Sequence, residues 1–316
     1  MTTVTEKQPR PTRSAITRLM DRAWLLLAFS SLCWSGNHIL GRAIEGQVPP
    51  VGISAVRWLI PAIVLWPLVR PHMARDWPAI KARLGVMLWL GITGGALFSA
   101  LQYVGLQHTT ALNVSVLNSL VPVLIVAAGA VLFRDHVGVG QVAGIATSLA
   151  GVLVIVTRAD LDTLRQLAFS WGDLIIILNM AVFSIYAACL RLQPSIHWLS
   201  FMFMLAVISA VSTLPFAVWE SLSGFTFQPT LLTLLAVVYV STFPSLFAFA
   251  AWNRGVELLG ANRAGPFLHL VPIYTAILGY AFLGEALAAY HVAGLVLILT
   301  GVWLATRSRS VVGQAE

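Results

Sequence analysis

Charged residues and cysteines are both scarce in this sequence. Only 10% of its 316 residues are charged, whereas 58% are hydrophobic and the mean hydropathy is +0.85. This composition excludes an ordinary soluble domain and places the chain in a lipid bilayer. The two cysteines, Cys33 and Cys189, both fall inside apolar runs, so neither a disulfide framework nor a metal site is expected. The net charge of +7 comes from scattered residues rather than a basic stripe, so it does not indicate nucleic-acid binding.

Acidic residues are missing from the central part of every apolar run. Asp173, Glu220, Glu257 and Glu285 all fall near the ends of such runs, where a solvated helix terminus is the expected role. A proton-coupled or cation-extruding site usually needs a carboxylate at membrane depth. Its absence weakens the interpretation as an exporter of cationic drugs. No cofactor is expected.

The apolar residues form about ten spans of roughly 18 to 24 residues, each long enough for a transmembrane helix. The predicted spans are 22–40, 50–69, 84–104, 109–133 and 138–157, followed by 172–190, 198–219, 230–253, 261–283 and 288–306. The connections are short, so no soluble catalytic domain is expected. The sequence predicts a disordered cytoplasmic arm at 1–21, an external linker at 158–171 and a cytoplasmic tail at 307–316.

The second half of the chain repeats the first at an offset of 150 positions, since 272 − 122 = 150. The residues that recur at this offset are Gly105, Ala111, Leu120, Val121, Pro122, Gly129, Gly144 and Gly151. This match predicts an internal duplication, with five-helix repeats at 22–157 and 172–306. Within it, Pro122 and Pro272 lie deep in apolar spans, where a proline kinks or breaks a helix. Such breaks at corresponding positions point to a transport site, although packing alone could also explain them.

The basic residues set the expected orientation, because lysine and arginine resist translocation. With the amino terminus inside, about fifteen of the 19 basic residues fall in inner segments, and the outer segments hold only Arg42, Arg158 and Arg165. Both termini are therefore expected in the cytoplasm, with an even number of spans. Five spans in each half then force the second repeat to be inverted relative to the first.

Several motifs resemble those of one transporter family. They are the "CWSGN" of the first span, Arg57 in the second, "SLVPVL" and "HLVPIY" in the fourth and ninth, and "FLGEAL" before the last. From residue 24 to 306 the sequence resembles the ten-helix EamA branch of the drug/metabolite transporter superfamily, and within it the bacterial aromatic amino acid exporters. The resemblance implies an all-α polytopic membrane protein whose ten transmembrane helices form two inverted five-helix repeats. The family's glutamate is present as Glu285, but Asp135 replaces it in the first half.

Polar residues at membrane depth are the candidates for a site. Asn118, Ser119 and His269 lie within about one turn of the two prolines, where they could bond freed carbonyl groups or face a cavity. For His269 the sequence leaves open a bond to the backbone or a contact with substrate. Arg57, toward the outer end of its span, could reach the outer headgroups or attract a substrate carboxylate. The glycines, including Gly144, indicate close helix packing.

Aromatic residues near the middle of the spans complete the candidate set. An aromatic-lined cavity with a few hydroxyls and amides would suit a neutral, partly hydrophobic zwitterion, although each ring could equally belong to an ordinary core. The hinges are predicted at Pro122 and Pro272. The predicted substrate-binding residues are Trp34, Asn37, His38, Asn118, Ser119, Ser184, Tyr186, Phe243, Phe247 and His269.

These observations predict a secondary transporter that exports small neutral or aromatic amino acids and related metabolites by alternating access. Its cavity is expected between the first, third, sixth and eighth spans of a protein in the cytoplasmic (inner) membrane. A multidrug or nucleotide-sugar carrier is the alternative. An intramembrane enzyme should show convergent acids, bases or metal ligands, and a scaffold would not need mirrored breaks. Beyond a small-molecule substrate and lipid no partner is expected, and a monomer is compatible with the sequence.

Overall fold

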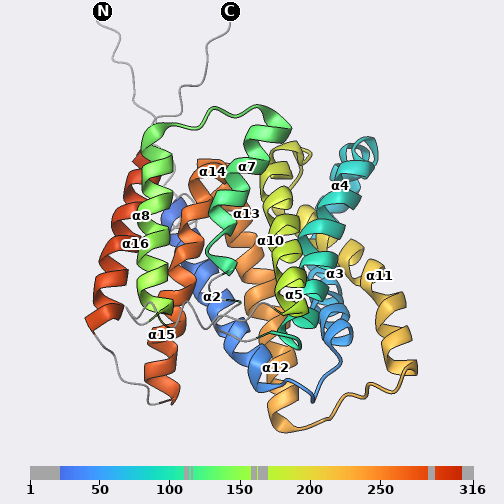
Figure 1. Cartoon of the computed structure of the whole chain (residues 1–316). Helices are drawn as coiled ribbons and strands as arrows, with labels where there is room; N and C mark the ends of the chain where they lie inside the picture. Colours follow the sequence, from blue (N-terminus) through green and yellow to red (C-terminus); the bar gives the residue numbers. More distant parts are fainter. Residues whose placement is uncertain are drawn as a thin grey trace, which may run out of the picture.

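The computed structural model describes residues 22–109, 114, 117–157, 162, 170–283 and 289–307. Every regular element in this described part is helical (Figure 1). The first half contains α2 (Ala23–Ala43), α3 (Pro50–Ala82), the continuous run α4 (Leu84–Gly91), η1 (Ile92–Leu97) and α5 (Phe98–Leu106), then α7 (Val121–Phe133) and α8 (Val139–Val156). The predicted linker at 158–171 and Glu285 lie largely or wholly outside the described residues.

The second half follows the same order. It contains α10 (Trp171–Cys189) with η2 (Leu190–Leu192), α11 (Trp198–Leu222), the run α12 (Leu231–Thr242), η3 (Phe243–Phe247) and α13 (Ala248–Leu259), the run α14 (Ala261–Ala264), η4 (Gly265–His269) and α15 (Leu270–Leu283), and finally α16 (Ala289–Arg307). The ten predicted spans each correspond to one of these helical runs. Five of the runs are long and apolar enough to cross a membrane by themselves. The prediction of an all-α membrane protein is therefore confirmed.

Helices α8 and α16 lie side by side (Figure 1) and pack through glycines. A Cβ atom at Gly144 would lie 2.6 Å from the carbonyl oxygen of Gly301, and one at Gly151 would lie 2.7 Å from that of Gly294. The contacting residue number falls along α16 as it rises along α8, so the helices are antiparallel. Since each helix ends its own repeat, the two repeats are inverted relative to each other, as predicted. Backbones can approach this closely only where side chains are absent.

Helices α3 and α11 form the second large contact between the repeats, and they too are antiparallel. At the start of α3, the backbone N–H groups of Val51 and Gly52 donate to the Glu220 carboxylate, at 3.0 and 2.8 Å. At the other end, the backbone N–H of His197 donates to Asp76 at 2.9 Å. The sequence predicted that the second span would end at residue 69. The helix instead continues to Ala82 because this extension packs against α11.

Two of the acids at helix ends, Asp173 and Glu220, are buried, contrary to the sequence-based expectation, whereas the side chain of Glu257 is 53% exposed, as expected. Glu220 is 7% exposed and caps α3, while Asp173 is fully buried in the first turn of α10. The Asp173 carboxylate accepts the backbone N–H of Ser170 at 2.6 Å and also bonds the Thr109 hydroxyl. These carboxylates satisfy backbone N–H groups that have no partner within the helix, which explains why they are retained in an apolar setting.

The third and eighth spans each contain a π-helix at the same place in the repeat. Adding 150 to the residue numbers of η1 (Ile92–Leu97) gives the range 242–247, which includes all of η3. The wider turns leave carbonyl groups that accept bonds from tryptophan: Trp58 Nε1 donates to Gly95 O and Trp34 Nε1 donates to Pro244 O, both at 3.1 Å. π-helical turns often mark functional positions in helices.

The fourth and ninth spans are broken near their prolines, and the breaks meet. Helix α7 begins at Val121, so Pro122 lies in its first turn, where the missing N–H removes no helical bond. In the ninth span the 3₁₀ turn η4 precedes α15, whose third residue is Pro272. His269 Nε2 lies 2.9 Å from the carbonyl oxygen of Ser119 across the two repeats. The spans are thus interrupted rather than bent.

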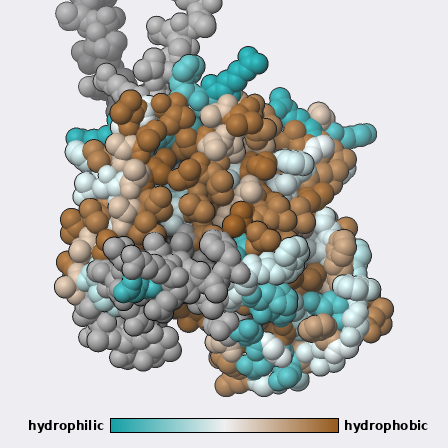
Figure 2. All heavy atoms as spheres, in the orientation of Figure 1, coloured by the Kyte–Doolittle hydropathy of each residue, from teal (hydrophilic) through white to brown (hydrophobic). Residues whose placement is uncertain are grey.

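The outer surface suits a bilayer. Figure 2 shows a band of hydrophobic side chains across one face, with hydrophilic residues above it. Large apolar side chains with half or more of their area exposed occur on helices from both repeats, for example Ile63, Leu178 and Val238. Exposed apolar area on this scale is expected where lipid replaces water as the solvent.

Candidate functional site

A small cavity lies where the two repeats meet. Its volume is about 40 Å³, which is room for about three water molecules. Elements α2, α3, α5 and α7 of the first repeat and α10, η4 and α15 of the second contribute to it. The sequence predicted a contribution from the eighth span, but the second, fourth and ninth spans line the cavity in its place. The lining residues are Trp34, Asn37, His38, Arg57, Phe98, Gln102, Asn118, Val121, Met180, Phe183, Leu268 and Val271.

Arg57 brings a charged group to this cavity. Its side chain is only 1% exposed, whereas the sequence left open that it extends to the lipid headgroups of the outer leaflet. Nε donates to the Ser245 hydroxyl at 2.7 Å, and Nη1 lies 3.4 Å from the hydroxyl of Tyr103. Nη2 is buried and has no hydrogen-bond partner. A buried guanidinium with one unpaired nitrogen is costly, because burial removes its hydration.

The hydroxyl of Tyr103 connects Arg57 to the first span. It donates to Asn37 Oδ1 at 2.8 Å, which fixes Asn37 against the cavity wall. The Arg57 Cζ atom lies 5.8 Å from the ring centroids of both Trp58 and Tyr103. Aromatic faces at this distance attract a cation. These contacts hold the guanidinium in place without neutralising its charge.

Amide groups form the neighbouring part of the wall. Asn179 Nδ2 donates to Gln102 Oε1 at 2.7 Å, which joins α10 of the second repeat to α5 of the first. This bond leaves Gln102 Nε2 and Asn179 Oδ1 without partners, and Asn118 Nδ2 is also unpaired. Unpaired buried amide atoms are uncommon in folded proteins. Their concentration around one cavity indicates a place for a polar ligand.

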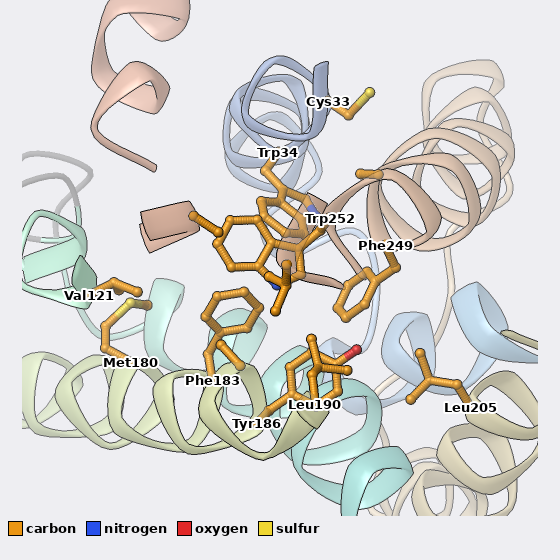
Figure 3. Close-up of a cluster of buried hydrophobic side chains, with 14 of the residues drawn as sticks. Cys33, Trp34, Val121, Met180, Phe183, Tyr186, Leu190, Leu205, Phe249 and Trp252 are labelled. Carbon is orange, nitrogen blue, oxygen red and sulfur yellow. The ribbon is translucent and has the colours of Figure 1, made fainter. Parts of the chain in front are cut away.

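Aromatic rings form another part of the wall. Trp34 packs edge to face against Phe183 with ring centroids 5.6 Å apart, and Phe183 lies 4.8 Å from Phe98. Trp252 and Phe249 pack behind Trp34, as Figure 3 shows for the buried cluster around it. Such pairs form a rigid apolar surface. The cavity is therefore lined by both polar and aromatic side chains.

Four of the predicted substrate-binding residues lie together on the cavity wall: Trp34, Asn37, His38 and Asn118. Two others, Ser119 and His269, lie just beside it. They are hydrogen-bonded to each other across the two repeats. His269 Nδ1 is 2.5 Å from the Ser148 hydroxyl, and Nε2 faces the Ser119 carbonyl. A carbonyl only accepts, so Nε2 carries the proton. Both ring nitrogens of His269 are thus occupied by protein groups.

Ser184 and Tyr186 lie behind the cavity wall. The Ser184 hydroxyl donates to the carbonyl of Met180 at 2.7 Å and lies 3.4 Å from that of Val121. The Tyr186 hydroxyl donates to Asn253 Oδ1 at 2.7 Å, and its ring fills the space over Gly94. These contacts join the sixth span to its neighbours, and neither side chain lines the cavity.

Phe243 and Phe247 point away from the cavity. Their side chains are 44% and 48% exposed on the outer surface. Ser245, between them, points inward and is fully buried against Arg57. Residues two positions apart on a helix face roughly opposite sides, so an inward Ser245 turns both phenylalanines outward. The helical spacing alone could not show which face was buried.

Sequence reasoning missed Phe98, Gln102, Asn179 and Met180. Gln102 is the one amide in the apolar span 84–104, and Asn179 is the one amide in 172–190. An amide side chain within a membrane span is costly unless it has a function or a partner. That signal could have identified both residues. Phe98 and Met180 carry no comparable signal, because apolar side chains are common on every face of these helices.

An ion pair joins the repeats at one end of the molecule. The guanidinium of Arg191 donates to both oxygens of Asp135, at 2.8 and 2.5 Å, and Asn262 Nδ2 donates to the same carboxylate at 3.2 Å. Asp135 follows α7 in the first repeat, whereas Arg191 and Asn262 belong to the second. The hydrogen bond from Arg191 holds the pKa of the Asp135 carboxyl below its usual value, and the charge of His136 acts in the same direction.

Two inverted five-helix repeats around a buried cavity are the architecture of many membrane transporters. The chain belongs to the EamA-like transporter family, which matches residues 22–157 and 170–307. Those two matches coincide with the two repeats of the fold.

Relatives cover almost the whole chain. An uncharacterized transporter of Bacillus subtilis, YyaM, is 30% identical over 290 residues, which are 89% of this chain and 92% of the relative. A Streptantibioticus cattleyicolor protein named "Probable terminal-alkyne amino-acid exporter" is 26% identical over 300 residues, covering 92% and 95%. A solved crystal structure at 22% identity covers 90% of this chain and 96% of its own, with a TM-score of 0.69. That likeness shows the shared fold.

Proposed function

We propose that this protein exports small neutral or aromatic amino acids and related metabolites across the cytoplasmic membrane by alternating access. The observation that carries the proposal is the cavity between the inverted repeats, which is lined by aromatic rings and by residues with unpaired polar atoms. An amino acid presents the same two kinds of surface. The amino-acid exporter among the relatives supports this substrate class.

The chemistry of the wall argues against cationic drugs as substrates. None of the described residues that line the cavity is acidic, and Arg57 adds a positive charge. A cation entering this space would meet repulsion and no neutralising group. The wall therefore favours neutral or negatively charged molecules over the cargo of a multidrug carrier.

The repeats must move before a substrate of this size can bind. The cavity of about 40 Å³ is far smaller than the ~300 Å³ at the lower end of typical small-molecule sites. The breaks before α7 and α15 contribute to its wall, and η1 and η3 adjoin the lining residues Phe98 and Arg57. Irregular turns absorb backbone changes more easily than regular helix. We place the moving parts at these four interruptions, with Pro122 and Pro272 fixing where two of the helices begin.

The proposed orientation has both termini and the Arg70-to-Arg83 side in the cytoplasm. Contacts of α3 with α11 place Arg75 and Ser223 at opposite ends of the helix pair. Single cysteines at Arg75 and at Ser223 should therefore react with an impermeant maleimide from opposite sides, Arg75→Cys only after the cell is opened. The native Cys33 and Cys189 are buried and should give little background. Labelling of Arg75→Cys in intact cells would overturn this orientation.

Counterflow in liposomes tests the transport activity. The pure protein is reconstituted with an excess of one unlabelled amino acid inside, and uptake of the labelled form is followed over time. We expect uptake above protein-free liposomes for phenylalanine and leucine, and none for cationic dyes. Trp34→Ala should weaken the preference for phenylalanine over leucine, because it removes part of the aromatic wall. A properly folded protein that exchanges no amino acid would contradict the proposal.

A further inference from the structure

The unpaired atoms around the cavity are not balanced between donors and acceptors. Three buried donor atoms on its lining residues lack partners: Arg57 Nη2, Gln102 Nε2 and Asn118 Nδ2. The corresponding unpaired acceptor is Asn179 Oδ1, on the residue bonded to Gln102. A ligand that satisfies these groups must be rich in acceptors. A carboxylate has two oxygens with about four acceptor positions.

The charge of Arg57 strengthens this requirement. The side chain is 1% exposed, and no carboxylate among the described residues pairs with it. Its two bonded nitrogens reach only the neutral hydroxyls of Ser245 and Tyr103. Those bonds orient the guanidinium and leave its charge uncompensated, whereas a bound carboxylate would supply both the charge and the missing acceptor.

No comparable group is present for the ammonium of an amino acid. The described lining residues contain no aspartate or glutamate, so the cavity offers an ammonium only neutral acceptors, including the His38 imidazole, and aromatic faces. In addition, an ammonium close to Arg57 would be repelled. The carboxylate and the ammonium of a zwitterion are therefore recognised very unequally here.

We propose that Arg57 is the carboxylate-binding residue of the cavity, and that the protein carries small monocarboxylates with an apolar or aromatic side chain whether or not they bear an α-ammonium group. This inference rests on the proposed function, since it concerns the same cavity. It widens the substrate class from amino acids to the matching hydroxy acids. The aromatic wall of Trp34, Phe98 and Phe183 receives the side chain, and Gln102 and Asn118 supply the remaining donors.

Binding of three related compounds to the purified protein in detergent tests the proposal. Phenylalanine has both charged groups, phenyllactate keeps the carboxylate but has a hydroxyl in place of the ammonium, and phenethylamine keeps the ammonium but lacks the carboxylate. We expect the dissociation constants of phenylalanine and phenyllactate to lie within about threefold of each other. Phenethylamine should bind at least about tenfold more weakly, because it leaves the charge of Arg57 unpaired.

Variants of Arg57 complete the test. Arg57→Gln should remove the preference for phenyllactate over phenethylamine, and Arg57→Lys should keep part of it, since the charge remains but the planar fork is lost. Arg70→Gln, the same change at an exposed position of α3, should bind like the wild type. Gel filtration and thermal unfolding show whether each variant is folded. If Arg57→Gln does not fold, the three-compound series on the wild type still decides the question.

The outcomes separate this inference from the proposed function. Binding of phenylalanine without phenyllactate would overturn the inference and leave amino acid export intact. Equal binding of phenethylamine and phenyllactate, or a preference that survives Arg57→Gln, would also overturn it. Failure of all three compounds to bind the folded wild type would contradict both the inference and the proposed function.

Discussion

Glycines set the distance between helices α8 and α16, because a glycine carries only a hydrogen atom in place of a side chain. A Cβ atom at Gly144 would lie 2.4 Å from the backbone nitrogen of Ala305 and 2.6 Å from the carbonyl oxygen of Gly301. Both are main-chain atoms, so no rotation of a side chain could relieve the overlap. Only glycine fits at this position as long as the two helices stay in backbone contact.

Gly144→Ala should therefore separate these helices and destabilise the protein by about 1–3 kcal/mol, the usual cost of overpacking. Gly85→Ala is the matched control, because a Cβ at Gly85 would meet no atom within 4 Å. Alanine forms helices better than glycine, so that variant should be as stable as the wild type or slightly more stable. Thermal unfolding of both purified variants measures the difference. Equal unfolding temperatures would show that α8 and α16 do not pack this closely.

At the scale of helices, the sequence predicts the number and order of spans well because lipid imposes long apolar segments. The 150-residue offset also relates Ser119 to His269, but the contact between these two equivalent positions is found only in the structure. Length and hydropathy do not reveal which way a helix faces in an all-apolar setting. Phe243 and Phe247 were consequently assigned to the cavity, although the inward residue of their turn is Ser245.

The sequence also could not predict where the helices depart from regular α-helical geometry. The π-helices η1 and η3 depend on tertiary bonds, since indole groups from other spans satisfy the carbonyls of Gly95 and Pro244. Asp173 forms a local capping box with Ser170, but its burial also depends on the bond to Thr109, which comes close only in the folded chain. A charge near the end of a span looks solvated until its partners are known. The same holds for Arg57, whose partners come from the third and eighth spans.

At the scale of the whole molecule, the ion pair of Asp135 and Arg191 links the two repeats. It lies at one end of the bundle, away from the cavity, and Asn262 extends it to the ninth span. The side chains of Asp135 and Arg191 are 20% and 39% exposed, so water reaches the pair and weakens it. An ion pair of this strength can break and re-form, which is compatible with the movement of the repeats that we propose.

The ion pair of Asp135 and Arg191 predicts a pH dependence of the protein's stability. Arg191 lowers the pKa of Asp135 in the folded protein below the ~3.9 of a free aspartate. A depressed carboxyl pKa contributes stability above the unfolded value, and this contribution is lost as the pH falls through the folded value. Asp135→Asn lacks it at every pH. The unfolding temperature of this variant should thus lie below that of the wild type at pH 6, and the gap should shrink below about pH 4.

Glu257→Gln is the control for this measurement. Glu257 also pairs with an arginine, Arg254, but its side chain is 53% exposed and the two residues belong to one helix. Its removal should leave the unfolding temperature almost unchanged across the same pH range, because an exposed pair within a helix contributes little. Thermal unfolding of the wild type and both variants between pH 3 and 7 gives the comparison. A gap for Asp135→Asn that stays constant down to pH 3 would mean that the charge of Asp135 does not hold the repeats together, and the contact between the repeats at this end of the molecule would then depend on helix packing alone.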